Sequence, residues 1–173
     1  MIHVHSGGLK GRKLSGLSGV QTRPTTNRVK EWIFSVLPNQ TENRVLDLFA
    51  GSGNLGIEAL SCGAVFCTFV EKSSAAIRII KKNVNRCEIA ERSQIVRSDV
   101  FAFLSRNPEK FDLVFADPPY GAVQLDRLID KVLPQLSSKG LFVLEESGHS
   151  PETTILPKRA KEIGQTKIRI YSA

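Results

Sequence analysis

The chain has 173 residues, of which 41% are hydrophobic and 24% charged, so it can bury a substantial core but is too short for two ordinary domains. No apolar run is long enough to span a membrane and no signal-peptide stretch opens the sequence, which predicts a soluble cytoplasmic protein. The three cysteines and three histidines lack metal-ligand or disulfide spacing, so we expect neither a disulfide framework nor a metal site; the net charge is +7.

The basic excess lies almost wholly in the first 30 residues, which contain no Asp or Glu. The remaining 143 residues hold 18 basic and 17 acidic side chains. A solvated flexible tail could also be basic, but so one-sided a segment favours a surface that faces phosphate groups. The six cations of this segment are Lys10, Arg12, Lys13, Arg23, Arg28 and Lys30.

In chain order, residues 1–22 are rich in glycine, serine and basic residues and predict a β-hairpin or an extended arm. A helix is predicted over 25–37, where apolar residues recur at helical spacing until Pro38 ends it. Strands and helices then alternate. The predicted strands are Arg44–Phe49, Ala64–Val70, Gln94–Arg97, Phe111–Ala116, Gly140–Leu144 and Lys167–Tyr171, and the predicted helices are Asn54–Ser61, Ser73–Arg86, Val100–Ser105 and Ala122–Leu136.

This alternation predicts an α/β fold with a doubly wound, Rossmann-like sheet of seven mostly parallel strands. Residues 1–22 would form a small basic hairpin, and residues 23–173 the main domain. Strand residues as uniformly apolar as 113–116 are typical of parallel strands covered on both faces. Ligands bind such sheets beyond the carboxyl ends of the strands, so functional residues are expected there.

A glycine-rich turn follows the first strand of the predicted sheet. Gly51, Gly53 and Gly56 give a G-x-G-x-x-G spacing between a strand and a helix, where the backbone turns tightly and can approach a ligand. Glu71 ends the next strand 20 residues after Gly51, and an acidic side chain at this spacing can accept hydrogen bonds from both hydroxyls of a ribose. A glycine-rich turn alone is often only structural, but together these residues predict a nucleoside-containing cofactor.

Acidic side chains decide between two classes of cofactor. Asp47 precedes the turn, where a carboxylate would be unfavourable beside the pyrophosphate of a dinucleotide but suits the amino group of S-adenosylmethionine. Asp99 ends the third strand and could accept a hydrogen bond from the adenine, with Val100 as a backbone donor. The predicted cofactor-binding residues are Asp47, Phe49, Ala50, Gly51, Gly53, Asn54, Glu71, Lys72, Asp99 and Val100.

The fourth predicted strand ends in Asp117-Pro118-Pro119-Tyr120. Asp and Pro are leading turn residues, so this stretch could be only a turn. Beside a cofactor site, however, it predicts a rigid catalytic loop that binds an aromatic amino group. Such a group is a poor nucleophile, because the lone pair of its nitrogen is delocalised into the ring. Asp117 and the Pro118 carbonyl would accept hydrogen bonds from that group and aim its lone pair, while Tyr120 stacks on the base.

These stretches resemble the RsmD-type family of bacterial ribosomal RNA guanine-N2 methyltransferases over nearly the whole chain. The resemblance rests on residues 7–14, 22–31 and 46–60 and on Asp117-Pro118-Pro119-Tyr120. It implies methyl transfer from S-adenosylmethionine to N2 of one guanine of small-subunit ribosomal RNA, the family's guanine 966, on assembled or assembling subunits. It also implies that Arg23, Pro24 and Thr25 border the active site, and we expect a monomer. The predicted RNA contacts are then Lys10, Arg12, Lys13, Arg23, Thr25 and Arg28.

Four other functions share parts of this pattern. An adenine-N6 methyltransferase could use the same four-residue loop, although 173 residues leave no room for a separate target-recognition domain on DNA. A protein-glutamine methyltransferase would more usually carry Asn at the position of Asp117. A dehydrogenase is disfavoured by Asp47, and an RNA-binding module without activity would show no methyl transfer.

Overall fold

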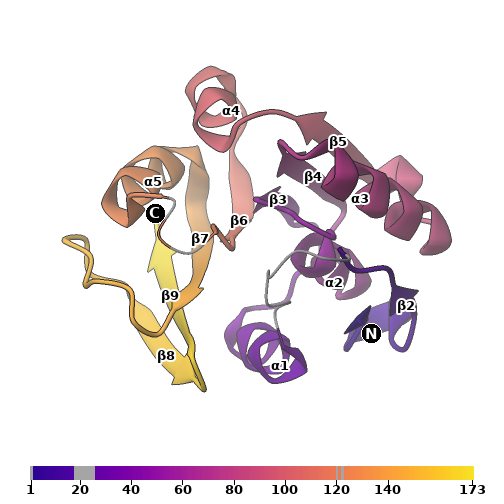
Figure 1. Cartoon of the computed structure of the whole chain (residues 1–173), viewed down its shortest axis with the longest axis horizontal. Coiled ribbons are helices and arrows are strands. Elements are labelled where there is room, and N and C mark those ends of the chain that lie inside the picture. Colours follow the sequence, from indigo (N-terminus) through magenta and orange to yellow (C-terminus); the bar gives the residue numbers. More distant parts are fainter. Residues whose placement is uncertain (1, 18–25, 120, 122) are drawn as a thin grey trace.

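The computed structural model describes residues 2–17, 26–119, 121 and 123–173. Its centre is a seven-stranded sheet in the order β5-β4-β3-β6-β7-β9-β8 (Figure 1). The first five strands in this order are parallel, and β9 pairs antiparallel with both β7 and β8, which confirms the predicted mostly parallel α/β sheet. The strands are β3 (Arg44–Leu48), β4 (Phe66–Glu71), β5 (Ser93–Arg97), β6 (Phe111–Ala116), β7 (Leu136–Ser147), β8 (Arg159–Ile163) and β9 (Thr166–Ser172).

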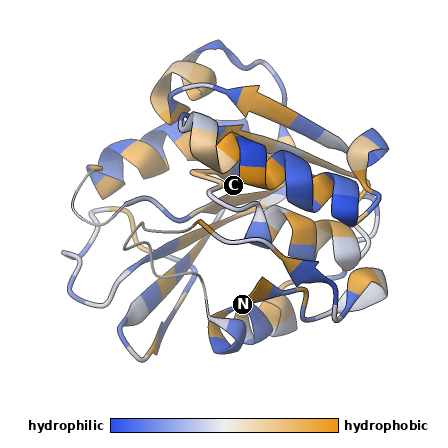
Figure 2. Ribbon diagram, turned by 45° about the vertical axis from the view of Figure 1, so that its right-hand side comes forward, coloured by the Kyte–Doolittle hydropathy of each residue, from blue (hydrophilic) through white to orange (hydrophobic). Residues whose placement is uncertain are grey.

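Helices cover both faces of this sheet. Alternate residues of each central strand belong to two apolar clusters, as Leu113 and Phe115 join one and Val114 and Ala116 the other. The first cluster includes residues of α1 (Asn27–Val36), α2 (Asn54–Ser61) and α3 (Ser74–Arg86), and the second includes residues of α4 (Val100–Arg106) and α5 (Leu125–Val132). Figure 2 shows hydrophobic and hydrophilic residues alternating along these helices, as expected when one face of a helix packs on a sheet.

The N-terminal segment forms a short hairpin that packs on α2 and α3. Its strands β1 (Ile2–His3) and β2 (Lys13–Leu14) are antiparallel and flank the 3₁₀ turn η1 (Gly7–Leu9). Val4 and Leu14 are buried in the first apolar cluster. Gly7 has a φ of +74°, and a Cβ there would lie 1.9 Å from the Ser61 carbonyl oxygen, so a glycine is needed where the hairpin meets the end of α2. The predicted hairpin is confirmed within residues 2–14.

Element boundaries differ from the predictions in places. The first helix begins at Asn27, since Thr26 caps it through a hydrogen bond from the Val29 N–H, and it ends at Val36 rather than 37. The predicted helix 122–136 is shorter, because Pro134 lies in a 3₁₀ turn, η3 (Leu133–Gln135), that follows α5. A third such turn, η2 (Ala90–Arg92), precedes β5. Strand β8 was not predicted, because its residues are mostly exposed and polar, as befits an edge strand.

One part of the charge interpretation is wrong. From its position in the basic N-terminal segment, Lys30 was predicted to be one of the phosphate-facing cations, but its side chain is fully buried. Its Nζ donates hydrogen bonds to the His3 carbonyl at 2.6 Å, to Asn54 Oδ1 at 3.0 Å and to Glu58 Oε2 at 2.8 Å. A buried ammonium needs such partners because leaving water is costly. Lys30 therefore joins the hairpin, α1 and α2 inside the protein and does not face solvent.

The three cysteines are free thiols, of which Cys67 and Cys87 are buried. Among the described residues, no helix is both long and apolar enough to cross a bilayer.

Candidate active site

The predicted functional loops leave neighbouring parallel strands at the same edge of the sheet. Leu48, at the end of β3, pairs with Ala116, at the end of β6, and with Val70 near the end of β4. Chain order reverses between β3 and β6, since β4 and β5 lie on one side and β7 on the other. The glycine-rich turn and Asp117 therefore both start at the switch point, where doubly wound sheets bind their ligands.

The glycine-rich turn has a backbone that few residues adopt. Gly51 and Gly53 have φ angles of +56° and +78°, and Phe49, which is not a glycine, has a φ of +56°. Gly53 directly precedes α2. A strained non-glycine residue in a tight turn is typical of binding sites, where surrounding structure maintains the conformation.

The third glycine of the motif serves packing. A Cβ on Gly56 would lie 2.4 Å from Phe69 Cε1, 2.6 Å from Cys67 Sγ and 3.0 Å from Asp47 Oδ2. These contacts leave no room for any side chain between α2 and the sheet. The glycine spacing thus brings the start of α2 close to the ends of β3 and β4.

Two predicted carboxylates hold the turn through its backbone. Glu71 accepts hydrogen bonds from the Gly51 N–H at 3.0 Å and the Ser73 N–H at 2.8 Å. Asp47 accepts one from the Gly56 N–H at 2.9 Å and is buried. Burial raises the pKa of Asp47 to about 8; the Gly56 hydrogen bond opposes this rise and the charge of Glu71 adds to it.

Three acids lie on one face of three adjacent strands. Asp47 of β3 pairs with Phe115 of β6, which pairs with Val143 of β7. Because side chains alternate along a strand, Asp117 and Glu145 share that face two residues further on. Burial raises the pKa of Asp117 well above its usual range, and the charges of Glu145 and then Asp47 add to the rise.

Comparison with known proteins agrees with this arrangement. The sequence model of a family described as "Conserved hypothetical protein 95" matches residues 2–172. Ribosomal RNA small subunit methyltransferase D of Escherichia coli is 32% identical over 177 residues, covering 98% of this chain and 89% of that one. The chain belongs to the RsmD family. A protein of the same name from Buchnera aphidicola is 41% identical over 69% of this chain and 63% of its own length.

Solved structures show the same fold. A hypothetical protein of Thermus thermophilus is 28% identical, with a TM-score of 0.87 and full coverage of both chains. An RNA methyltransferase from Salinibacter ruber, solved with S-adenosyl-L-homocysteine, has a TM-score of 0.70 at 16% identity, covering 87% of this chain and 93% of that one. The sheet of this RsmD-family chain therefore has the Rossmann-like fold of class I methyltransferases.

The remaining predicted cofactor residues lie at the same edge. Asp99 Oδ1 accepts a hydrogen bond from the Ala102 N–H at 3.1 Å, so Asp99 caps α4 as well as following β5. Val100 and Ala50 are buried, and Lys72 is exposed just after β4. The binding roles of these residues stay predictions.

The loop after β6 is described in part. Asp117 is half-buried, Pro118 is buried and Pro119 is exposed. Tyr120 lies outside the described residues, so its stacking role stays a prediction. The same holds for Arg23, Pro24 and Thr25, which the resemblance assigns to the border of the site.

Asn54 connects the glycine-rich turn to the N-terminal segment. It directly follows Gly53, and its Oδ1 accepts the hydrogen bond from Lys30. Its buried Nδ2 has no hydrogen-bond partner among the described residues. Glu58, one turn further along α2, accepts bonds from the backbone N–H groups of His5 and Ser6 as well as from Lys30. Most buried donors in proteins have a hydrogen-bond partner, so this unpaired Nδ2 beside the glycine-rich turn is unusual.

Sequence reasoning missed Lys30, Glu58 and Glu145 as site components. Lys30 has the same helical spacing as the buried Ile33 and Leu37, at i, i+3 and i+7, and this pattern could have shown that it faces the core. Glu58 is the one acid of the otherwise uncharged helix α2, which was a second signal. Glu145 had no comparable signal, since its burial depends on the pairing of β7 with β6 and β9.

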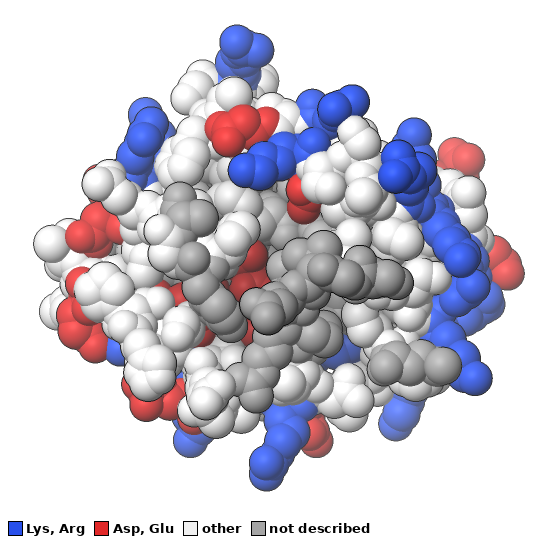
Figure 3. Space-filling view, in the orientation of Figure 1, with Lys and Arg blue, Asp and Glu red and all other residues white. Residues whose placement is uncertain are grey.

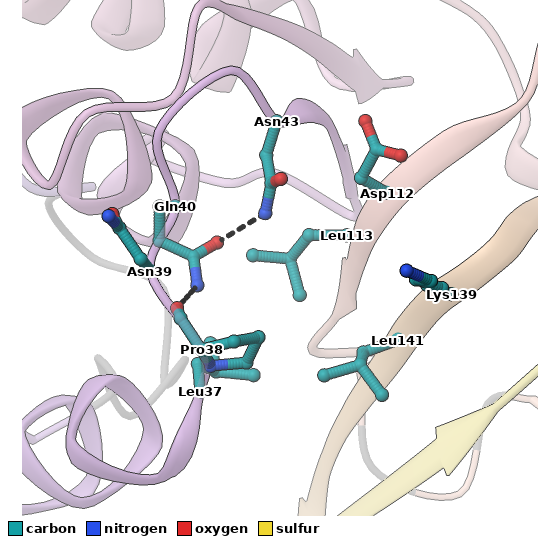
Figure 4. A pocket seen from close by; sticks show the side chains of 9 residues that line it. All are labelled: Leu37, Pro38, Asn39, Gln40, Asn43, Asp112, Leu113, Lys139 and Leu141. Carbon is teal, nitrogen blue, oxygen red and sulfur yellow. Dashed lines mark hydrogen bonds between the residues drawn. The ribbon is translucent and has the colours of Figure 1, made fainter.

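A separate hollow lies at the opposite edge of the sheet. Figure 4 shows that it is lined by residues that follow α1 and by residues near the amino ends of β6 and β7, with Asn43 Nδ2 bonded to Gln40 Oε1 at 3.1 Å. None of the predicted site residues lines it. The chemistry of this chain is therefore expected at the other edge.

Proposed function

We propose that this chain transfers a methyl group from S-adenosylmethionine to N2 of a guanine in small-subunit ribosomal RNA, at the family position 966, on assembled or assembling small subunits. One observation carries the proposal. The glycine-rich turn and the Asp117 loop leave adjacent parallel strands at the switch point of a class I methyltransferase fold. The names of the RsmD-family relatives support ribosomal RNA of the small subunit as the substrate.

The residues beside the turn fit S-adenosylmethionine. Asp47, Glu71 and Asp99 provide acidic side chains that suit a ligand with a positively charged sulfur and amino group. The buried Asn54 Nδ2 is a donor available for the ligand's carboxylate. Glu71, already oriented by the backbone of Gly51 and Ser73, keeps lone pairs free for ribose hydroxyls.

When bound, S-adenosylmethionine would supply an electrophilic methyl carbon: the guanine amino nitrogen would form its new bond to that carbon as the carbon–sulfur bond breaks, leaving S-adenosylhomocysteine. Asp117 and the Pro118 carbonyl accept hydrogen bonds from that amino group, which favours a pyramidal nitrogen and directs its lone pair. The negative charge of Asp117 offsets the positive charge that develops on nitrogen, and Asp117 or a water molecule bonded to it takes the released proton. Pro118 and Pro119 fix the backbone of this loop.

The direct test is incubation with radiolabelled S-adenosylmethionine and either naked ribosomal RNA or small subunits that lack the modification, followed by nucleoside analysis. We expect label in N2-methylguanosine, with subunits as the better substrate. Label in N6-methyladenosine would instead identify an adenine-N6 methyltransferase, and no label in any RNA would overturn the proposal.

The role of Asp117 has its own test. Asp117→Asn should bind S-adenosylmethionine with unchanged affinity in calorimetry and lose at least about 100-fold in kcat, because the amide removes the charge that stabilises the transition state. Asp130→Asn, an exposed position on α5, is the matched control and should keep the wild-type rate. A normal rate for Asp117→Asn would refute this mechanism.

A further inference from the structure

Helix α3 carries a basic surface that the sequence interpretation did not include. From Lys72 to Cys87 the chain has five Lys or Arg residues and no Asp or Glu. Arg78, Lys81, Lys82 and Arg86 are all exposed, while the opposite side of α3 is buried through Ala76, Ile77, Ile80, Asn83 and Val84. Figure 3 shows Lys and Arg side chains gathered along the right-hand side of the molecule, where Figure 1 labels α3 and β2.

These cations form a row along the helix axis. Arg78, Lys82 and Arg86 are four residues apart, so they lie on one face in successive turns, about 6 Å apart along the axis and about 12 Å in all. Among the described residues, Arg78, Lys81 and Lys82 form no ion pair with an acid. Three neighbouring exposed cations without acidic partners suit a chain of phosphates better than they suit folding stability.

The row continues into the N-terminal hairpin without a break. Arg12 Nη1 donates to the Arg86 carbonyl at 2.8 Å, and Arg86 Nη1 donates to the Lys13 carbonyl at 3.1 Å. Lys10, Arg12 and Lys13 are exposed there, and Arg12 lies 3.5 Å from Glu88. The hairpin and α3 therefore present one basic surface.

This surface is tied to the candidate active site. α3 begins three residues after Glu71, and its cap Ser73 donates its backbone N–H to that carboxylate. Asn83 of α3 bonds both the backbone of Ser15, just after β2, and the carbonyl of Ser52 in the glycine-rich turn, at 2.8 to 3.0 Å. The row of cations thus starts at the edge of the sheet that carries the site and leads away from it to the hairpin.

We infer that α3 and the hairpin together bind the phosphate backbone of the RNA that flanks the methylated base, with Arg78, Lys81 and Lys82 as contacts. The inference rests on the proposed function and assigns to it a second RNA-binding element. The phosphate contacts hold the RNA in register and carry no base specificity, so they govern substrate affinity and its salt dependence and leave the chemical step unchanged.

The test compares two triple variants of equal charge change. The α3 variant is Arg78→Gln, Lys81→Gln and Lys82→Gln; Arg86 is kept because it holds the hairpin. The control is Lys158→Gln, Arg159→Gln and Lys161→Gln, which are exposed positions at or beside β8, the edge strand at the opposite end of the sheet from β5. RNA binding is measured by fluorescence anisotropy from low to high salt with a labelled ribosomal RNA fragment, alongside methylation kinetics and S-adenosylmethionine calorimetry.

For the α3 variant we expect a KM for RNA at least about tenfold higher, an unchanged kcat and an unchanged cofactor affinity. The plot of log affinity against log salt concentration should become shallower by about 2 to 3, since each lost phosphate contact removes about 0.7 to 0.9. RNA affinity and salt dependence equal to those of the β8 control would overturn the inference. Failure of the wild-type chain to methylate any RNA would instead overturn the proposed function, and the salt dependence would still test the surface.

Discussion

Replacing Lys30 by methionine should cost this protein a large part of its stability. The ammonium group is fully buried, and its three N–H bonds go to His3, Asn54 and Glu58. Methionine fills a similar volume but leaves the Glu58 carboxylate with backbone partners alone and two oxygen acceptors unpaired. Removing one partner of a buried ion pair typically costs about 3–5 kcal/mol. For a chain of this size that corresponds to a fall in Tm of about 10 °C.

The assay is thermal and urea unfolding followed by circular dichroism. Lys131→Met, at an exposed position on α5, is the matched control and should change the free energy of unfolding by less than about 0.5 kcal/mol. A double-mutant cycle with Glu58→Gln isolates the pair, and the double variant should be more stable than the sum of the single losses implies. A loss below about 1 kcal/mol for Lys30→Met, with additive effects in the cycle, would refute the reasoning that this contact joins the hairpin to the domain.

The remaining predictions concern the edge of the sheet that carries the site. Gly56→Ala should lose about 1–3 kcal/mol of unfolding free energy, because its Cβ would meet buried side chains at 2.4–2.6 Å; Gly8→Ala, where a Cβ meets nothing within 4 Å, should be nearly neutral in the same melting experiment. The pKa of Asp47 is about 8 in the folded protein and about 4 in the unfolded chain, so its contribution to stability is full below pH 4 and is lost as the pH rises to 8. Over pH 6 to 8, affinity for the cationic S-adenosylmethionine should rise as Asp47 ionises, and calorimetry showing the same pH dependence in Asp47→Asn would contradict this. Glu145→Gln should move the rising limb of the pH profile of methyl transfer to lower pH, because the charge of Glu145 helps to raise the pKa of Asp117. An unchanged pH profile would show that Glu145 does not affect the ionisation of Asp117 during the reaction.

The predictions that held are those that depend on short stretches of sequence. The glycine spacing, the runs of apolar strand residues and the helical periodicities are local, and they predicted the doubly wound sheet and the strand ends at which Asp47, Glu71 and Asp117 lie. Edge strand β8 was not predicted, because an exposed, polar strand lacks the apolar pattern on which strand prediction relies.

Counting charges along the chain gave the wrong interpretation of Lys30 and overlooked α3. Formal charge depends on sequence, but whether a cation meets water or a carboxylate depends on which elements pack together. Lys30 lies under the hairpin against Glu58, 28 positions away, whereas the cations of α3 stay exposed because the other side of that helix faces the sheet.

By itself, then, the sequence determined the fold class and the chemical groups of the site, because turn geometry and backbone periodicity are set by residues close together in the chain. The tertiary structure alone decided which of those groups meet. The pairing of β3, β6 and β7 brings Asp47, Asp117 and Glu145 onto one face, and burial there shifts the pKa of Asp47 and Asp117 upward, since desolvation depends on everything packed around a carboxyl group.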